Sequence, residues 1–408
     1  MKVLLYGINY SPELVGVAKY TSEMAEWLVK QGHEVHVVTA PPYYPGWKVW
    51  PKYSKYFYSR SIISGSIVWR CPIFVPSRPS SILRILHLTS FVFSSALMLA
   101  IQLFWRPNLV FLVAPTLLCA PSALLFSKLS GAKSILHIQD FEVDALFGLD
   151  LLSERTRHSI FKRLAFYFES IALSKFDIVS SISPGMIKRL RDKGVSNKCI
   201  SFLPNWSELN RFKNVEVSQK LIKELGIRGE KKVILYSGNM GEKQGLESIV
   251  LAAQKLQTRE DLVFLLVGDG ASKKYIRSMA IDLNLSNLVF APLQAYEDLP
   301  SLLASADVHL VIQKTGVADA VLPSKLTNIF AVGGNAVITA DISTTLGQLA
   351  EDYPGIAVIV QPESVESLLS GIHKALNMPR FNGIAQAYAQ EFLDKEKILS
   401  RFFGELDE

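Results

Sequence analysis

Short apolar runs alternate with amphipathic stretches from one end of the chain to the other. The runs are rich in Val, Ile and Leu and have the length of buried strands, whereas the stretches between them repeat apolar residues at helical spacing. A strand, a helix and a second strand of this size form a crossover in a parallel sheet. The predicted strands are 3–8, 34–39, 109–113, 134–140 and 177–183, followed by 233–236, 262–267, 288–290, 308–312, 336–339 and 357–360. The pattern therefore predicts an α/β fold built on doubly wound parallel sheets.

The length of the chain indicates more than one domain. With 408 residues it is longer than a chain that folds around one ordinary hydrophobic core. We expect an N-terminal domain over 1–205, a second domain over 206–382, and a C-terminal segment over 383–408 that is helical from about 383 to 403. The polar stretch 207–217 is expected to act as a linker.

One apolar segment is ambiguous. Residues 86–105 carry no formal charge, and about 20 apolar residues suffice to span a bilayer. Serine, threonine and glutamine interrupt the segment, however, and another sheet strand follows at Leu109. We interpret it as a crossover helix that is buried on one side and dips into a membrane surface on the other, and the spanning alternative stays open. Three arginines flank it and could meet lipid phosphates: Arg78, Arg84 and Arg106.

A second segment, 41–58, is dense in Pro, Tyr and Trp and also contains three lysines. Such aromatics could rest at a membrane interface or stack on sugar rings, or they could simply pack beneath a domain edge. We leave these alternatives open.

Composition narrows the class of protein. Hydrophobic residues make up 49% of the chain and charged residues 20%, as in a globular protein, and the net charge of +6 is mild. This charge suits phosphates or anionic head groups and does not by itself favour nucleic acid. The three cysteines are far apart and form no CxxC pair, so a disulfide framework or zinc site is not expected and a reducing cytoplasm is the simplest location.

The most informative stretch is 232–253, KVILYSGNMGEKQGLESIVLAA. A buried strand precedes a loop with three glycines, and helical spacing begins near Gly245. A helix start and free backbone N–H groups attract an anion, and Lys243 adds a mobile positive charge. The loop matches neither the P-loop nor the GxGxxG pattern, and a purely structural turn is the alternative.

A second helix start of this kind follows the strand 308–312. Pro323 suits the first turn of a helix, so Ser324 and Lys325 would lie beside free N–H groups. Gly268 closes a third strand with a further glycine-rich turn. Two anion-friendly helix starts on one parallel sheet suggest a nucleotide diphosphate held between them.

In the first half, strand ends offer other candidates. Asp140 follows the strand that begins at 134 and is our preferred group for positioning an acceptor hydroxyl, with a helix N-cap as the structural alternative. Gly16 precedes a helix and could let a substrate approach the backbone, or it could be an ordinary loop glycine.

Four segments together resemble the donor-binding half of retaining family 4 glycosyltransferases. They are VILYSGNMGEKQGLESIVLAA, FLLVGDG, LPSLLASADVHLVI and PSKLTNIFAVGGNAVITA, and LLYGINYSPELVGVAKYTSEMAEWLVKQGHEVHVVT resembles the acceptor side. The likeness covers nearly the whole chain and is greatest to bacterial exopolysaccharide and O-antigen enzymes, particularly colanic-acid-type fucosyltransferases. It implies a GT-B fold: two Rossmann-like domains facing across a cleft, with a C-terminal helix that returns to the N-terminal domain.

The resemblance also implies site residues. The family's paired glutamates fall at Ala320 and Asn328, so neither carboxylate is present; Asn328 could bond ribose hydroxyls and Asp319 is a guess for the sugar-binding acid. Gln139 stands where many members have a histidine near the sugar. Lys243 is one residue before the usual phosphate lysine. Together with the candidates found at strand ends and helix starts, the expected catalytic residues are Lys243, Asp140 and Gln139, and the expected donor-binding residues are Gly16, Gly238, Asn239, Gly241, Gln244, Gly245, Gly268, Asp319, Ser324, Lys325 and Asn328.

The expected function is therefore retaining transfer of a sugar, fucose or another deoxy or amino sugar, from a nucleotide-diphosphate donor to a polyprenyl-diphosphate-linked saccharide. The product would belong to an exopolysaccharide, lipopolysaccharide or O-antigen. We expect no cofactor, no metal and no nucleic-acid partner, and a cytoplasmic protein peripherally attached to the inner membrane surface. A sugar-nucleotide epimerase of the same fold, or a non-catalytic sugar-nucleotide-binding protein, is the alternative.

Overall fold

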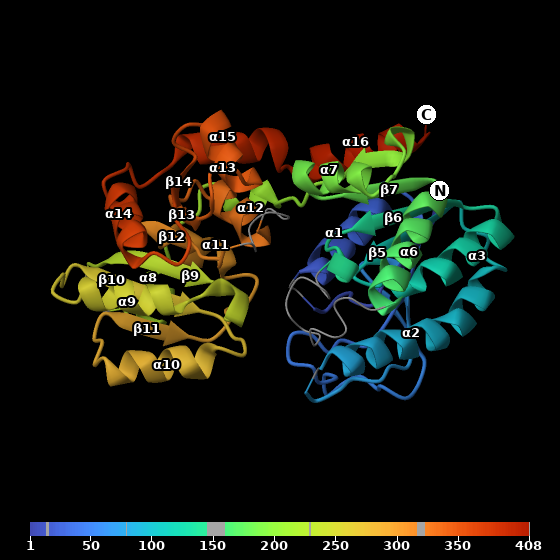
Figure 1. Cartoon of the computed structure of the whole chain (residues 1–408), viewed down its shortest axis with the longest axis horizontal. Coiled ribbons are helices and arrows are strands. Elements are labelled where there is room, and N and C mark those ends of the chain that lie inside the picture. The colour runs from blue at the N-terminus through green and yellow to red at the C-terminus, as the bar shows by residue number, and fades with distance from the viewer. Residues whose placement is uncertain (14–15, 79, 145–159, 228–229, 316–322, 408) are drawn as a thin grey trace. The chain divides into compact units, whose positions relative to one another are not determined.

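The computed structural model describes residues 1–13, 16–78, 80–144, 160–227, 230–315 and 323–407. It divides the chain into two compact units (Figure 1). The N-terminal unit comprises Met1–Leu203 with Phe402–Glu408, and the C-terminal unit comprises Pro204–Arg401. Each unit is built around its own mostly parallel sheet, so the prediction of two doubly wound α/β domains is confirmed.

The sheet of the N-terminal unit has the order β3-β4-β2-β1-β5-β6-β7-β8. All neighbours are parallel except β3 and β4. Its strands are β1 (Lys2–Tyr6), β2 (Glu34–Thr39), β3 (Ser59–Ile63), β4 (Ser66–Arg70), β5 (Leu109–Ala114), β6 (Lys133–Ile138), β7 (Ile178–Ser181) and β8 (Ile200–Phe202). The helices are α1 (Val17–Lys30), α2 (Ser81–Gln102), α3 (Ala120–Ser130), α6 (Ile160–Lys175) and α7 (Pro184–Asp192), with short 3₁₀ turns η1 (Leu117–Cys119) and η2 (Asn197–Cys199).

The sheet of the C-terminal unit has the order β11-β10-β9-β12-β13-β14 and is parallel throughout. Its strands are β9 (Lys232–Ser237), β10 (Leu262–Val267), β11 (Leu288–Ala291), β12 (Val308–Val311), β13 (Ala336–Thr339) and β14 (Ala357–Val360). Its helices are α8 (Gln219–Glu224), α9 (Glu247–Lys255), α10 (Lys273–Asp282), α11 (Leu299–Ala304), α12 (Ser324–Ala331), α13 (Thr345–Asp352), α14 (Val365–Leu376) and α15 (Gly383–Phe392), with 3₁₀ turns η3 (Leu209–Phe212) and η4 (Glu242–Gln244). The last helix, α16 (Lys395–Asp407), begins in this unit, and its residues from Phe402 onward belong to the N-terminal unit. Two apolar clusters cover the two faces of this sheet, because its strands are buried on both sides.

Two expectations about the joining segments are wrong. The predicted single helix from about 383 to 403 is two helices, α15 and α16, because Leu393 and Asp394 leave the helix to pair with Ser207. Ser207 donates its N–H to the Leu393 carbonyl over 2.8 Å and is fully buried. The stretch from Ser207, expected to be a linker, is therefore packed into the C-terminal unit.

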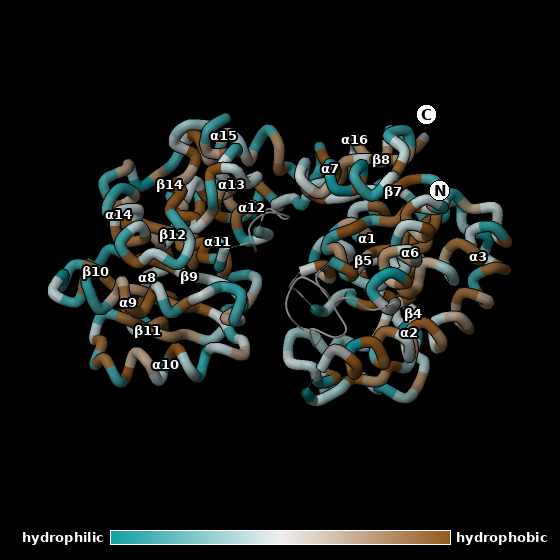
Figure 2. Tube along the Cα trace, in the orientation of Figure 1, coloured by the Kyte–Doolittle hydropathy of each residue, from teal (hydrophilic) through white to brown (hydrophobic). Residues whose placement is uncertain are grey.

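Helix α2 packs on the N-terminal unit with one face only. Its residues His87, Phe91 and Ser95 are buried, and Ser95 Oγ lies 2.6 Å from the Tyr6 hydroxyl. On the opposite face, Ile82, Phe93 and other apolar side chains are exposed, and Figure 2 shows hydrophobic residues along α2 and α3. By length and composition the segment Ile82–Gln102 could cross a membrane, with 28% of its most apolar window buried. In the structure, one face of this helix packs on the sheet of the N-terminal unit.

Candidate functional site

The loops that follow β9 and β10 touch through their backbones. Gly268 has φ +149°, and a Cβ placed there would lie 1.9 Å from the Gly238 carbonyl oxygen. Gly270 has φ +153°, and its Cβ would lie 2.5 Å from the Met240 carbonyl oxygen. The Met240 N–H donates to the Asp269 carbonyl over 2.8 Å. Only glycine permits this approach, so the two loops form one rigid edge at the carboxyl ends of β9 and β10.

The turn between Gly241 and Gly245 is shaped by its own side chains. Gln244 Oε1 accepts a 3.0 Å hydrogen bond from the Gly241 N–H, and Gly245 takes the left-handed conformation with φ +61° before α9 begins at Glu247. The Asn239 side chain lies against Gly241 and Gly270, with its Oδ1 2.7 Å from the place of a Gly270 Cβ. Asn239 and Gln244, expected to contact the donor, thus also hold the loop in shape.

Lys325 extends from the start of α12 to this loop. Its ammonium nitrogen lies 4.0 Å from the centre of the Tyr236 ring and would be 3.1 Å from a Cβ on Gly238. The Tyr236 hydroxyl donates its proton to the Asn239 carbonyl over 2.6 Å, so it offers Lys325 no negative charge. Burial lowers the pKa of Lys325 to about 7. The structure therefore brings the lysine at the start of α12 to the first glycine of the loop after β9, since Gly238 and Lys325 meet across 87 residues of sequence.

Two further lysines belong to the same edge. Lys243 lies in η4 and is exposed, and its carbonyl accepts from the Lys314 N–H over 3.0 Å. Lys314 follows β12, and its Cγ would lie 3.0 Å from a Cβ on Gly245. The sequence analysis did not select Lys314. The sequence did point to this residue, because Lys314 lies three residues beyond a buried parallel strand, where such sheets present functional groups.

The other candidate donor-binding residues of the C-terminal unit do not all lie at this edge in the same way. Ser324 is exposed as the first residue of α12, and Pro323 occupies the N-cap. Asn328 accepts a 2.8 Å hydrogen bond at Oδ1 from the Ser207 hydroxyl, so its oxygen anchors the chain that enters the unit. Asp319, with Ala320, lies outside the described residues.

In the N-terminal unit, Gln139 belongs to a buried polar chain. The Gln139 carboxamide nitrogen lies 3.0 Å from His137 Nε2, and His137 Nδ1 lies 2.9 Å from the Ser180 hydroxyl. An amide nitrogen can only donate, so His137 Nε2 must accept and the imidazole is neutral, with its proton on Nδ1. Burial lowers the pKa of His137 to about 3, in agreement with this. His137 is a histidine of the sheet interior, and Gln139 lies just beyond the end of β6.

Gly16 forms the N-cap of α1 with φ +59°, and a Cβ there would meet no atom within 4 Å. The space beside its backbone is open, as expected for a glycine that lets a ligand approach. The preceding turn is fixed by Glu13, whose Oε1 accepts from the N–H groups of Tyr43 at 2.6 Å and Tyr44 at 2.7 Å.

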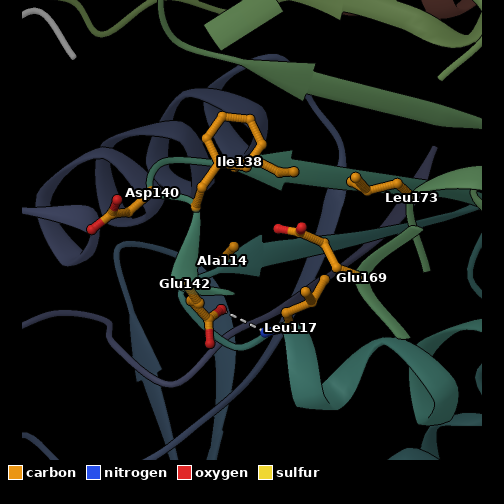
Figure 3. A pocket seen from close by; sticks show the side chains of 8 residues that line it. Ala114, Leu117, Ile138, Asp140, Glu142, Glu169 and Leu173 are labelled. Atoms are coloured by element: carbon orange, nitrogen blue, oxygen red, sulfur yellow. Dashed lines mark hydrogen bonds between the residues drawn. The ribbon is translucent and has the colours of Figure 1, made fainter. Parts of the chain in front are cut away.

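Asp140 lies on the rim of a small pocket that also contains Glu142 and Glu169 (Figure 3). Glu142 Oε1 accepts from the Leu117 N–H over 2.6 Å, and Glu169 pairs with Lys193. Burial raises the pKa of Glu142 to about 7, and the neighbouring charges of Asp140 and Glu169 act in the same direction. In Figure 3 the Glu169 carboxylate points into the pocket and that of Asp140 points away from it. Sequence reasoning selected Asp140 and missed Glu142, although both lie in the same acidic loop.

The two edges differ in what they can do chemically. The edge of the C-terminal unit combines lysines with helix starts and suits a phosphate. The pocket of the N-terminal unit places carboxylates where they can accept hydrogen bonds from hydroxyl groups. Among the residues that the structure describes, no group of three or more His, Cys, Asp or Glu side chains could hold a metal ion.

Comparisons with known proteins agree on one class. Residues 217–392 match the family described as "Glycosyl transferases group 1", and residues 15–206 match the "Glycosyl transferase 4-like domain". The chain is 52% identical over 408 residues, covering 100% of both sequences, to the Escherichia coli K12 protein named "Putative colanic acid biosynthesis glycosyl transferase WcaI". It is 23% identical over 76% of its length to an N-acetyl-alpha-D-glucosaminyl L-malate synthase of Bacillus anthracis, of which it covers 73%.

Solved structures match over the full length. The sucrose-phosphate synthase of Thermosynechococcus elongatus superposes with a TM-score of 0.74 at 17% identity, covering 99% of this chain and 98% of that one. Anabaena HepE, solved in complex with UDP and glucose, superposes with a TM-score of 0.71 at 14% identity, covering 100% and 99%. At identities this low, the similarity to these structures shows the shared fold alone.

Proposed function

The chain belongs to the family 4 glycosyltransferases of GT-B fold, and on this premise we propose what it transfers and how. We infer retaining transfer of a sugar, fucose or another deoxy or amino sugar, from a nucleotide-diphosphate donor to a polyprenyl-diphosphate-linked saccharide. The relative of E. coli is named for colanic acid biosynthesis, so we assign this chain to the assembly of a polysaccharide of the colanic acid or lipopolysaccharide type.

The observation that carries the proposal is that Lys325, at a helix start, contacts the glycine-rich loop that also carries Lys243. Lys325 at the start of α12 reaches Gly238, and Lys243 lies in the turn before α9. A diphosphate leaving group carries the charge that such an edge stabilises. HepE, which shares the fold, was solved with UDP, and a nucleotide diphosphate is the ligand we assign here.

The proposed reaction needs few covalent participants. The acceptor hydroxyl oxygen forms a bond to the anomeric carbon on the face from which the diphosphate departs, and the hydroxyl proton passes to the departing phosphate oxygen. Lysines and backbone N–H groups stabilise the charge that grows on that phosphate, which is the dominant kind of contribution in such sites. Asp140 positions the acceptor hydroxyl, Gln139 lies near the sugar, Gly16 lies near the acceptor and the donor phosphate, and no metal takes part.

A non-catalytic binding protein is the second candidate. Its support is that both family glutamates are replaced, by Ala320 and Asn328, and that the Asn328 oxygen is bonded to Ser207. An epimerase would need a charged acid and base beside the sugar.

One experiment separates the three functions. The protein is incubated with radiolabelled nucleotide sugars and a lipid-linked acceptor, after a thermal-shift screen has selected the donor. Label in the lipid fraction indicates transfer, an altered sugar in the nucleotide fraction indicates epimerisation, and a thermal shift without turnover indicates binding alone. Either of the last two results would overturn the proposal.

We also propose that the N-terminal unit attaches to an anionic membrane surface. Apolar side chains are exposed along α2 and α3, which contact each other, including Phe93 at 76% exposure and Leu129 at 64%. Exposed basic residues flank them, among them Arg78 and Arg106. An amphipathic helix with such a rim binds lipid through its apolar face and anionic head groups through its charges.

Flotation with vesicles of anionic and of neutral lipid tests this attachment. The double substitution of Phe93 and Leu97 by Ser should abolish flotation with anionic vesicles at low salt. The matched control replaces Tyr275 and Ile281, equally exposed apolar residues of α10 in the other unit, and should float normally. Loss of flotation in both variants, or in neither, would contradict the assignment to α2.

A further inference from the structure

The strand order of the C-terminal sheet reverses between β9 and β12. In the order β11-β10-β9-β12-β13-β14, the chain moves outward from β9 to β11 and then returns to β12, on the other side of β9. The loops that follow β9 and β12 start at neighbouring strand ends and lead in opposite directions. Parallel sheets commonly bind their ligands at such a reversal, outside the carboxyl ends of the strands.

Two lysines lie at this reversal, one in each loop. Lys243 belongs to the turn after β9, and Lys314 follows β12. The Lys314 N–H donates to the Lys243 carbonyl over 3.0 Å, so the two loops are joined at the lysines themselves. Lys325 approaches the same loop at Gly238, from the start of α12. Three lysines from separate places in the sequence therefore lie in or beside one loop.

The side chain of Lys314 lies across Gly245, at the end of the turn after β9. A Cβ on Gly245 would lie 3.0 Å from Lys314 Cγ and 3.4 Å from its Cε, so the aliphatic stem follows the glycine as far as the carbon that bears the ammonium. Gly245 has φ +61°, and its missing side chain leaves room for the stem. The contact holds the ammonium of Lys314 at the Gly245 end of the turn.

The backbone beside Lys314 is held by Glu363, in the loop after β14. The Thr315 N–H donates to Glu363 Oε2 over 3.2 Å. The pKa of Glu363 is lowered, first by its hydrogen bonds with Thr315 and to a smaller extent by the charge of Lys314. Glu363 has φ +58°, a conformation that residues other than glycine adopt rarely and that surrounding contacts must maintain. The loop that carries Lys314 is therefore anchored on both sides, to Lys243 and to Glu363.

The turn after β9 has a neutral side chain at its own end. Gln244 precedes Gly245, and its Oε1 accepts from the Gly241 N–H over 3.0 Å, so this side chain shapes the turn. The family resemblance places a phosphate-binding lysine at this position, where the chain has glutamine. The stem of Lys314 lies against the next residue, and its ammonium brings a positive charge to the same end of the turn.

We propose that Lys314 is a further diphosphate-binding residue, which supplies from the loop after β12 the positive charge that Gln244 does not. This inference rests on the proposed donor site and adds a residue to it. A lysine ammonium is a compact charge with three donors on a flexible stem, so it can serve a phosphate from either of two adjoining loops.

Calorimetric titration of the full chain with UDP, GDP, ADP and dTDP identifies a nucleotide that binds, and that nucleotide is the probe for every variant. Lys314→Met keeps a stem on Gly245 and removes the charge. We expect its dissociation constant to rise about tenfold or more, as for the loss of a charge-assisted hydrogen bond.

The matched control is Lys374→Met, which removes an exposed lysine from the last turn of α14. That helix follows β14 and runs back along the sheet, so its last turn is distant from the carboxyl ends of the strands. Lys374→Met should bind the nucleotide as the natural protein does, and both single variants should match the natural protein in melting temperature.

A lysine moved to position 244 tests whether the charge itself is what binds. The double variant Lys314→Met with Gln244→Lys returns a cation to the turn, whereas Lys314→Met with Gln244→Met does not. Both lose the oxygen that accepts from Gly241, so they share any change in the shape of the turn. The first should bind the nucleotide about tenfold more tightly than the second.

The outcomes distinguish this inference from the proposed function. Unchanged binding by Lys314→Met, an equal loss in Lys374→Met, or equal binding by the two double variants would overturn the inference and leave the donor site in place. If none of the four nucleotides binds to the natural protein, the proposed donor site fails and the inference with it.

Discussion

At the carboxyl end of the C-terminal sheet, Lys243, Lys314 and Lys325 stand around a glycine-rich edge, whereas the N-terminal sheet brings Asp140, Glu142 and Glu169 around one pocket. Both edges come from the same βα topology, in which loops after parallel strands collect on one side. The two edges differ in the sign of their charges. Burial acts alike on both, because it favours the neutral amine of Lys325 and the neutral acid of Glu142.

One architecture can supply opposite chemistry through the side chains at its strand ends. At the C-terminal edge, glycines let the backbones of two loops touch, and lysines are the main charged side chains there. The N-terminal edge has a buried neutral histidine and three carboxylates that can accept hydrogen bonds, with Asp140 exposed, Glu142 partly buried and Glu169 buried. An anionic donor suits the first edge, and a hydroxyl-bearing acceptor suits the second.

The largest effect is expected from Gly268→Ala, which breaks the C-terminal edge. The new Cβ would lie 1.9 Å from the Gly238 oxygen, and the φ of +149° disfavours any side chain. The free energy of unfolding should fall by about 3 kcal/mol or more. Denaturant unfolding measures this. The control is Gly131→Ala in the N-terminal unit, where φ is +74° and nothing lies within 4 Å, so the loss should be about 1 kcal/mol.

Lys325→Ala tests the charge of the C-terminal edge rather than its shape. If Lys325 contacts the diphosphate as the bond breaks, kcat should fall on the order of 100-fold, or about 2.7 kcal/mol, while donor binding weakens less. Steady-state kinetics with varied donor would reveal this. A normal kcat with a raised KM would instead show that the lysine binds the substrate and the transition state equally well.

Lys243→Ala should also lower kcat on the order of 100-fold, with little change in the melting temperature because the side chain is exposed. Its neighbour Glu242 provides the control, since Glu242→Ala alters the same exposed turn without removing a cation. Near-normal turnover in both lysine variants would move the diphosphate site elsewhere and leave the glycine loop as a structural turn.

The smallest effect is expected from Glu142→Gln in the N-terminal pocket. Because the folded pKa of Glu142, about 7, is above its unfolded value, the folded state binds more protons between about pH 4 and 7. Stability from this group is present below pH 4 and is lost as the pH rises through 7. The glutamine variant keeps an acceptor for the Leu117 N–H and should melt about 2–4 °C higher at pH 8, with no difference at pH 4. Equal melting temperatures at both pH values would contradict the raised pKa.

Local sequence patterns determined most strands, because each is a short run of Val, Ile and Leu buried on both faces. The strands 34–39, 262–267, 336–339 and 357–360 have the predicted bounds. The missed strands are β3, β4 and β8. The strands β3 and β8 form the two edges of the sheet, and β3 is largely exposed, so it lacks the apolar run that marks a buried strand. The glycine-rich loop after β9 was also visible, since glycine and a following helical period are local features.

Which side chains meet at a strand end was decided only by the tertiary structure. Nothing near residue 325 in the sequence indicates that its amine reaches Gly238, or that Asn328 bonds Ser207 instead of facing a ligand. Lys314 and Glu142 could have been selected from their places just after buried strands, but their neighbours come from elements distant in sequence and were visible only in the structure. Sequence periodicity sets the strands and the loops that join them. The electrostatic state of a group depends on desolvation and on charges from other elements, which exist only once those elements have packed.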